Sequence, residues 1–229
     1  MLTFLGRGSA FTESQNSAFF TEGEALILLD CAMSAFHALL ARGITQKQIY
    51  VLVTHTHGDH VGGIPMLIHC ARYMSGAHVT VIAPSAEVAE DLEYLIARLD
   101  GCDKTAYTII TADAAPFPWL AGVIPVKHAE TLAGRCFGYR LCLGGADVLY
   151  TGDTSELAPF LPYLHSGAYL YTEAACFDSG VHLYIDRVLP ELKRLCAESV
   201  HVYLMHIDDE AQMAEKIKGT AIEFAPLVS

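Results

Sequence analysis

Positive charge is scarce in this chain. The 229 residues contain 14 Lys and Arg against 26 Asp and Glu, which gives a formal net charge of −12 at pH 7. Proteins that bind a long polyanion such as tRNA usually cluster Lys and Arg to displace its counterions, whereas the basic residues here are dispersed along the sequence. A large nucleic acid partner is therefore disfavoured.

Long apolar runs and regularly spaced cysteines are also missing. No stretch reaches the length needed to span a membrane, and the first residues lack the basic start and long apolar core of a secretory signal. No membrane partner is therefore expected. No two of the seven cysteines show the two-residue spacing of a metal or redox motif (Cys31, Cys70, Cys102, Cys136, Cys142, Cys176 and Cys196). An odd, scattered set favours free thiols in a reducing, cytoplasmic compartment over a disulfide framework or a Cys-ligated zinc.

Hydrophobic residues, in contrast, are plentiful. They make up 52% of the chain, and only 17% of the residues are charged. A chain of this length and composition can bury a sizeable core, and we expect a single domain over residues 1–229.

The most informative motif is the run Thr-His-Thr-His-Gly-Asp-His, which follows an apolar stretch at residues 49–53. It places His55, His57, Asp59 and His60 within six positions. Imidazole nitrogen and carboxylate oxygen suit zinc, iron or manganese, whereas histidines clustered this tightly without a metal would repel one another when protonated. Residues two apart in an extended segment face the same way, so His55 and His57 can converge on one ion while Asp59 and His60 turn toward a second.

A centre with two metal ions needs further ligands downstream. Three residues answer that need, because each ends or follows a strand-like run: His128, Asp153 and His206. Catalytic groups collect on loops at one edge of a rigid sheet, and repeated ligand types at strand ends are typical of such a site.

With these motifs the chain resembles the metallo-β-lactamase fold superfamily of dinuclear hydrolases, over nearly its whole length. The resemblance implies two divalent metal ions, zinc first, with manganese or iron as alternatives. It implies that His55, His57 and His128 bind the first metal, that Asp59, His60 and His206 bind the second, and that Asp153 bridges them. The segments Gly6–Ala10, Asn16–Ser17, Val61–Pro65 and Thr151–Thr154 agree with it. Two dications would also make the pocket locally positive despite the net negative charge.

Hydrophobic periodicity predicts alternating strands and helices. We expect strands at 17–20, 25–30, 78–82, 107–111, 122–127, 136–143, 147–151, 168–173 and 201–205, and helices at 34–42, 64–74, 85–99 and 209–218. Pro190 interrupts a further helical stretch at 185–196, where a helix kinks or begins. The mixture suits an α/β fold, the four-layer αββα sandwich that the resemblance implies.

Two metals that share one water are machinery for hydrolysis, because they lower the pKa of the water and polarise the electrophile. The metal ligands alone do not choose among esters, thioesters, lactams, lactones and phosphodiesters. Oxidoreductase chemistry is less favoured, since the diiron flavoproteins of this superfamily carry a carboxylate where this chain has His57.

The segment between residues 173 and 183 resembles the tRNase Z and phosphodiesterase branch. By that resemblance His182 is the general acid for the leaving oxygen and Glu173 orients it through a hydrogen bond. The alternative role for His182 is to cap a helix or shape the substrate pocket. Only residues 129–152 separate the third metal histidine from the bridging aspartate, which leaves no room for the arm that grips tRNA in tRNase Z.

We therefore expect a dinuclear metal-dependent hydrolase, with phosphodiesterase activity on small, anionic phosphodiesters or nucleotides. The candidate catalytic residues are Asp59, Glu173 and His182. One alternative is an ester, thioester or lactone hydrolase with the same metals, and another is a non-catalytic metal- or nucleotide-binding sensor. The sequence does not fix the oligomeric state, although proteins of this superfamily are often homodimers.

Overall fold

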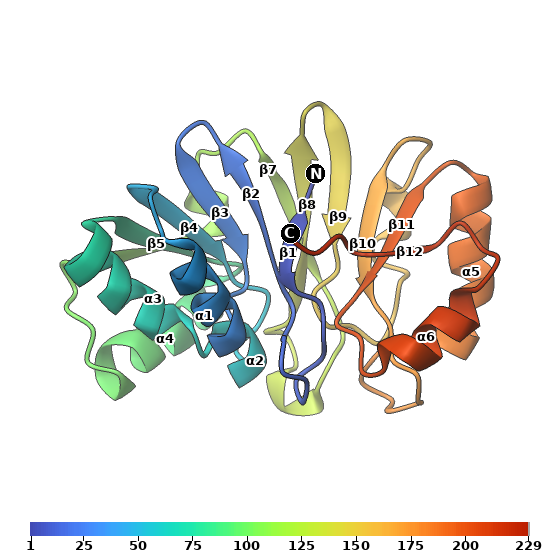
Figure 1. Cartoon of the computed structure of the whole chain (residues 1–229), viewed down its shortest axis with the longest axis horizontal. Coiled ribbons are helices and arrows are strands. Elements are labelled where there is room, and N and C mark those ends of the chain that lie inside the picture. The colour runs from blue at the N-terminus through green and yellow to red at the C-terminus, as the bar shows by residue number, and fades with distance from the viewer. Residues whose placement is uncertain (229) are drawn as a thin grey trace. The chain divides into compact units, whose positions relative to one another are not determined.

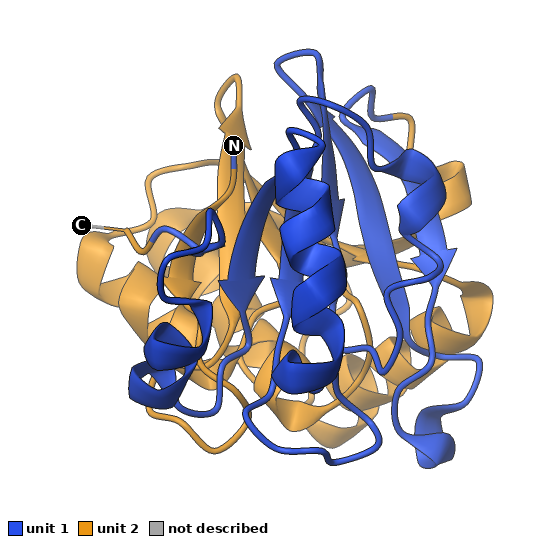
Figure 2. Ribbon diagram, turned by 90° about the vertical axis from the view of Figure 1, so that its right-hand side faces the viewer, with its two compact units in different colours: residues 1, 117–226 blue, residues 2–116, 227–229 orange. Residues whose placement is uncertain are grey.

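The computed structural model describes residues 1–228, and the chain forms two compact units. Unit 1 holds residues 1 and 117–226, and unit 2 holds residues 2–116 with 227–228 (Figure 2). Each unit is built on one mixed sheet of six strands, with helices beside it (Figure 1).

The sheet of unit 2 has the order β1-β2-β3-β4-β5-β6. Its strands are β1 (Thr3–Gly6), β2 (Ser17–Glu22), β3 (Ala25–Leu29), β4 (Gln48–Leu52), β5 (His78–Ala83) and β6 (Tyr107–Thr111). The first three strands pair antiparallel, whereas β3 to β6 run parallel to one another. Parallel strands are covered on both faces, which explains why β3, β4 and β5 read as nearly continuous apolar runs.

Helices connect the parallel strands of unit 2. They are α1 (Met33–Arg42), α2 (Gly58–Val61), α3 (Ile64–Cys70) and α4 (Ala86–Glu93). Two helix ends predicted from the sequence are confirmed. Gly43 ends α1 with φ 79°, a backbone angle that glycine adopts without strain. At the start of α4, the Ser85 hydroxyl accepts a hydrogen bond from the Val88 amide. The predicted helices at 64–74 and 85–99 are confirmed, except that each finishes in a π-helical turn, η1 (Ala71–Ser75) and η2 (Tyr94–Leu99).

The sheet of unit 1 has the order β12-β11-β10-β9-β8-β7. Its strands are β7 (Leu120–Pro125), β8 (Phe137–Leu143), β9 (Ala146–Tyr150), β10 (Tyr169–Glu173), β11 (His201–Met205) and β12 (Glu223–Phe224). Strands β7, β8 and β9 form an antiparallel meander, and β9 to β12 are parallel. Strand β12, only two residues long, escapes prediction because so short a segment shows no periodicity.

Two helices, α5 (Ile185–Ala197) and α6 (Glu210–Ile217), accompany this sheet. Buried residues of α5 such as Leu192 and Leu195 share one apolar cluster with Leu170 of β10 and Leu204 of β11. Pro190 lies inside α5, five residues after its start, so of the two alternatives, a kink or a helix start at this proline, the start is wrong. A proline there removes one backbone donor, and the burial of the apolar face of α5 outweighs that loss.

Among the described residues, 1–228, none of the helices combines the length and the apolar character that crossing a bilayer requires.

Candidate functional site

The histidine run of unit 2 lies at the carboxyl ends of two parallel strands. Leu29 at the end of β3 pairs with Leu52 at the end of β4, so the residues that follow each strand emerge at the same edge of the sheet. Asp30 follows β3, and the segment 54–60 follows β4. Helix α2 begins within this segment, with His57 as its N-cap.

Four side chains of this run bring donor atoms together, as the sequence predicts. His55 Nε2 lies 2.9 Å from His57 Nδ1, and His60 Nε2 lies 3.3 Å from Asp59 Oδ2. His55 and His60 are buried, and their rings lie 4.1 Å apart between centroids. The donor atoms that face each other are therefore imidazole nitrogens and a carboxylate oxygen, held largely away from water.

Asp30 fixes the orientation of these rings, and sequence reasoning missed it. Its carboxylate, fully buried, accepts hydrogen bonds from the Thr54 amide (2.8 Å) and the Thr54 hydroxyl (2.9 Å), and it lies 2.8 Å from His60 Nδ1. The Thr54 hydroxyl also lies 3.0 Å from His55 Nδ1. With Nδ1 of both rings directed at these partners, Nε2 of His55 faces His57 and Nε2 of His60 faces Asp59.

A signal for Asp30 was present in the sequence. It follows the apolar run at residues 26–29, as Asp153 follows the run at 148–150. The neighbouring thiol of Cys31 is fully buried, and this burial, with a contribution from Asp30, raises its pKa to about 12.

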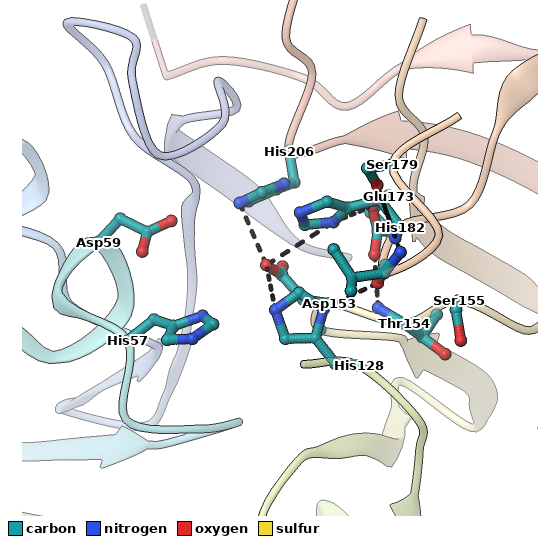
Figure 3. Close-up of polar contacts among 12 residues, drawn as sticks. His57, Asp59, His128, Asp153, Thr154, Ser155, Glu173, Ser179, His182 and His206 are labelled. Carbon is teal, nitrogen blue, oxygen red and sulfur yellow. Dashed lines mark hydrogen bonds and ion pairs between the residues drawn. The ribbon is translucent and has the colours of Figure 1, made fainter. Parts of the chain in front are cut away.

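In unit 1, the three predicted downstream ligands also lie at one edge of a sheet. His128 follows β7, Asp153 follows β9 and His206 follows β11, and these strands point the same way. Asp153 Oδ2 lies 3.4 Å from His206 Nε2 and 3.7 Å from His128 Nε2 (Figure 3). The structure thus brings together all three residues within this unit.

The separations within unit 1 fit a metal ion better than direct hydrogen bonds. They exceed the usual 2.7–3.2 Å of a hydrogen bond. Two ligands held about 2.0–2.2 Å from one tetrahedral ion lie about 3.4 Å apart, which matches the spacing around Asp153. Asp153 is 2% exposed, so its carboxylate has little access to solvating water, and two imidazole nitrogens aimed at it are suited to share a cation with it.

Glu173 and His182 form a second contact beside this set. His182 Nδ1 lies 2.8 Å from Glu173 Oε2 and 4.0 Å from Asp153 Oδ2 (Figure 3). Glu173, at the end of β10, is fully buried and also accepts a hydrogen bond from the Thr154 amide. The predicted contact between Glu173 and His182 is present.

The loop that carries His182 is anchored by contacts that sequence reasoning missed. The amides of Val181 and His182 donate to the Ser179 hydroxyl at 3.3 and 3.1 Å. The Val181 carbonyl lies 2.8 Å from His128 Nδ1, which leaves His128 Nε2 to face Asp153. A serine three residues before a histidine is too common a pattern to signal such a contact in advance.

The segment between His128 and Asp153 contains no long insertion. It consists of the short turn η4 (Glu130–Leu132) and the β8–β9 hairpin, as predicted. This part of the described chain therefore offers no arm of the kind that grips tRNA in tRNase Z.

The sequence profile of one protein family, described as Anti-Pycsar protein Apyc1, matches residues 1–226. The chain belongs to the Apyc1 family. One relative, an Anti-Pycsar protein Apyc1 of Bacillus phage 010DV004, is 26% identical over 238 aligned residues, which cover 92% of this chain and 90% of the relative.

Solved structures confirm the fold. A diphosphatase of the PhnP family matches all of this chain and 95% of its own length, with a TM-score of 0.75 and 21% identity. Human tRNase Z, short form, matches 100% of this chain and 97% of its own, with a TM-score of 0.68 and 17% identity. The predicted metallo-β-lactamase-like α/β fold is thus confirmed, with two mixed six-stranded sheets flanked by helices. The resemblance to tRNase Z and its neighbours holds for the fold, whereas the family is Apyc1.

Proposed function

We propose that this chain is a dinuclear metal-dependent phosphodiesterase that hydrolyses cyclic nucleotides to nucleoside monophosphates. The observation that carries the proposal is membership of the Apyc1 family over residues 1–226, since proteins of this family degrade cyclic nucleotides. The chemistry of the His and Asp side chains supports it, because such ligands suit divalent metals that activate water.

In this proposal the two units act as one hydrolase domain and hold two ions, zinc first among the candidates. His55, His57 and His128 would hold one ion, Asp59, His60 and His206 would hold the other, and Asp153 would contribute to both. When bound, the pair supplies a water of lowered pKa and stabilises the negative charge that develops on the phosphoryl oxygens.

The residues around these ligands prepare the site before substrate arrives. Asp30 and Thr54 hold the Nδ1 side of His55 and His60, and the Val181 carbonyl holds the Nδ1 side of His128. Partners of this kind fix the ring orientation of metal-binding histidines and make the other ring nitrogen more basic.

His182 is proposed to deliver a proton to the leaving ribose oxygen. Its contact with Glu173 holds the ring at Nδ1 and leaves Nε2 available for the substrate. An alkoxide is a poor leaving group, so a positioned acid accelerates its departure. Ring opening of a 3′,5′-cyclic phosphate then consumes one water and yields a single nucleoside monophosphate.

Two features of the chain, its net charge and the short segment after His128, favour a small substrate over a long nucleic acid. The net charge of −12 and the absence of an insertion between His128 and β8 remove two features by which a protein holds a long nucleic acid.

The experiment that tests the proposal offers the metal-replete protein a 3′,5′-cyclic nucleotide, a thioester and a lactone in parallel. Chromatography should detect nucleoside monophosphate as the main product, and Asp153→Asn should abolish its formation. Turnover of the thioester or lactone alone would assign the chain to another hydrolase class, and no turnover of any of them would favour a binding role.

A further inference from the structure

The loop between β1 and β2 carries an aromatic side chain, Phe11, that faces solvent. Phe11 has a relative exposure of 102%, the highest among the large hydrophobic residues of the described chain, ahead of Tyr73 at 76%. A fully exposed phenyl ring loses the stability that burial would provide. The ring therefore contributes little to the packing of its own unit and is accessible to a ligand.

This loop is a firmly built turn. The Gly8 amide donates to the Ser14 carbonyl at 2.9 Å, and both the amide and the hydroxyl of Thr12 donate to the Ser9 carbonyl. The Gln15 side chain donates to the Ala10 carbonyl at 3.0 Å. These bonds surround the position of Phe11, so the ring is presented from a fixed backbone.

Two glycines let the strands of this loop approach each other. A Cβ at Gly8 would overlap the Thr12 side chain, and a Cβ at Gly6 would overlap the Gln15 carbonyl. Glycine is therefore required at both positions by the closeness of the loop's two sides. This close approach fixes the shape of the loop, and the Phe11 ring faces solvent from it.

The loop emerges at the edge of the sheet where the ligands of unit 2 lie. Because β2 runs antiparallel to β3, the start of β2 pairs with the end of β3, as Ala18 pairs with Leu29. The residues before β2 therefore reach the same edge as the segments after β3 and β4 (Figure 1). Phe11 and the histidine run share this edge.

Hydrogen bonds continue from the base of the loop to the histidine run. The Gln15 amide donates to the Ser34 hydroxyl at 2.9 Å, and the Ala32 amide donates to the Ser17 hydroxyl at 3.2 Å. The amide of Cys31, the residue before Ala32, donates to the His60 carbonyl at 2.7 Å. The position of the loop is thereby tied to that of a proposed metal ligand.

We propose that Phe11 is a binding residue for the nucleobase, with its ring stacked on the base of a cyclic nucleotide whose phosphate lies at the metals. This inference rests on the proposed function. A phenyl ring has no hydrogen-bonding atom, so it contacts the face of any base and does not read its edge. Phe11 thus contributes affinity for nucleotides as a class, without selecting one base.

The test compares two substrates that differ only in the base. One is a 3′,5′-cyclic nucleotide, and the other is the methyl riboside 3′,5′-cyclic phosphate, in which a methoxy group replaces the base. Stacking on one base changes affinity by about 5-fold to 150-fold. Phe11→Ala should raise KM for the nucleotide by a factor in this range and leave KM for the methyl riboside unchanged. Phe11→Trp should keep both values near those of the wild type.

Tyr73→Ala is the matched control. Tyr73 is an exposed aromatic of the same unit, but it lies in η1, shortly before the start of β5, and therefore at the opposite edge of the sheet. Its removal should change neither KM.

Three outcomes would overturn the role of Phe11. They are an unchanged KM for the nucleotide in Phe11→Ala, an equal loss for both substrates, and a change of molecular mass in sedimentation that accounts for the loss. If the wild type hydrolyses neither substrate, the proposed function itself fails, so the two failures are distinguishable.

Discussion

His182 Nδ1 lies 2.8 Å from Oε2 of Glu173, a carboxylate that is fully buried at the end of β10. The side chain of His182 is itself 21% exposed, so part of the imidazole remains accessible to a ligand. A buried carboxylate that holds an accessible imidazole is the arrangement expected of a positioned proton donor. Changes to this pair should therefore alter the rate of hydrolysis in a way that depends on the leaving group of the substrate.

Removal of the imidazole should affect substrates according to their leaving group. His182→Ala should slow hydrolysis of a cyclic nucleotide, which releases an alkoxide, by about 10²–10⁴-fold. Hydrolysis of bis(4-nitrophenyl) phosphate should fall far less, because nitrophenolate leaves without a proton. Steady-state rates for both substrates measure the ratio, and Glu173→Gln should change it in the same direction. An equal loss for both substrates would contradict the acid role.

Loss of Asp30 should weaken metal binding without removing a ligand. Asp30→Ala leaves the Thr54 amide and hydroxyl without their shared acceptor and releases His60 Nδ1. Residues that orient metal-binding histidines typically contribute about 10–100-fold to metal affinity. Competition with a chromogenic chelator measures this affinity, and Asp100→Ala, an exposed position, is the control. Equal affinities in the two variants would contradict the orienting role of Asp30.

Close packing at Gly138 gives a prediction about stability. A Cβ there would lie 2.6 Å from Phe160 Cζ and 2.7 Å from the Tyr150 carbonyl. Gly138→Ala should therefore destabilise the protein by about 1–3 kcal/mol, which lowers Tm by about 2–4 °C for each kcal/mol. Gly122→Ala, on the neighbouring strand β7 with open space around its Cβ, should leave Tm nearly unchanged. Thermal unfolding followed by circular dichroism checks both, and equal Tm values would show that the backbone relaxes at Gly138.

The pair Asp147 and His165 predicts a pH-dependent contribution to stability. Hydrogen bonds from Arg140 and then from His165 lower the pKa of Asp147, and the hydrogen bond to Asp147 raises the pKa of His165. The Asp147 contribution is present above its unfolded-state pKa and is lost as pH falls through its folded-state pKa. The His165 contribution is present below its unfolded-state pKa and is lost as pH rises through its folded-state pKa.

Asp147→Asn should therefore lower Tm most at mildly acidic pH, where both groups are charged. The difference from wild type should shrink as Asp147 becomes protonated, and it should fall partly at alkaline pH, where only the contact with Arg140 persists. Unfolding temperatures at a series of pH values measure the effect. Asp100→Asn should give a flat profile, and a flat profile for Asp147→Asn would refute the assignment.

The fold was largely readable from the sequence because most elements have strong periodicity or clear end signals. The strand at 107–111 and the helix that ends at Gly43 agree with the structure within a residue or two. Strand β12 and the π-helical turns were not foreseen, because two residues show no period and a π turn differs from an α turn only in its hydrogen bonds. Helix α5 runs through Pro190, since burial of its apolar face outweighs the local preference.

The candidate site could be predicted where a residue type that binds metal stands at the end of a predicted strand. Histidines and aspartates at strand ends predicted the clusters that the structure assembles within each unit. Asp30 followed the same rule and was missed because a lone aspartate after a strand is common. The anchoring of His182 by Ser179 depends on loop geometry, which no short sequence pattern encodes. The catalytic and metal-binding roles of these residues stay predictions.

The central claim is that this chain hydrolyses cyclic nucleotides with two metal ions. The most direct test is to strip the protein with a chelator, add zinc or manganese in steps, and follow hydrolysis of a cyclic nucleotide at each step. The account predicts no activity at the start and a rate that reaches its plateau at two ions per chain. A plateau at one ion per chain, or full activity in metal-free protein, would contradict it.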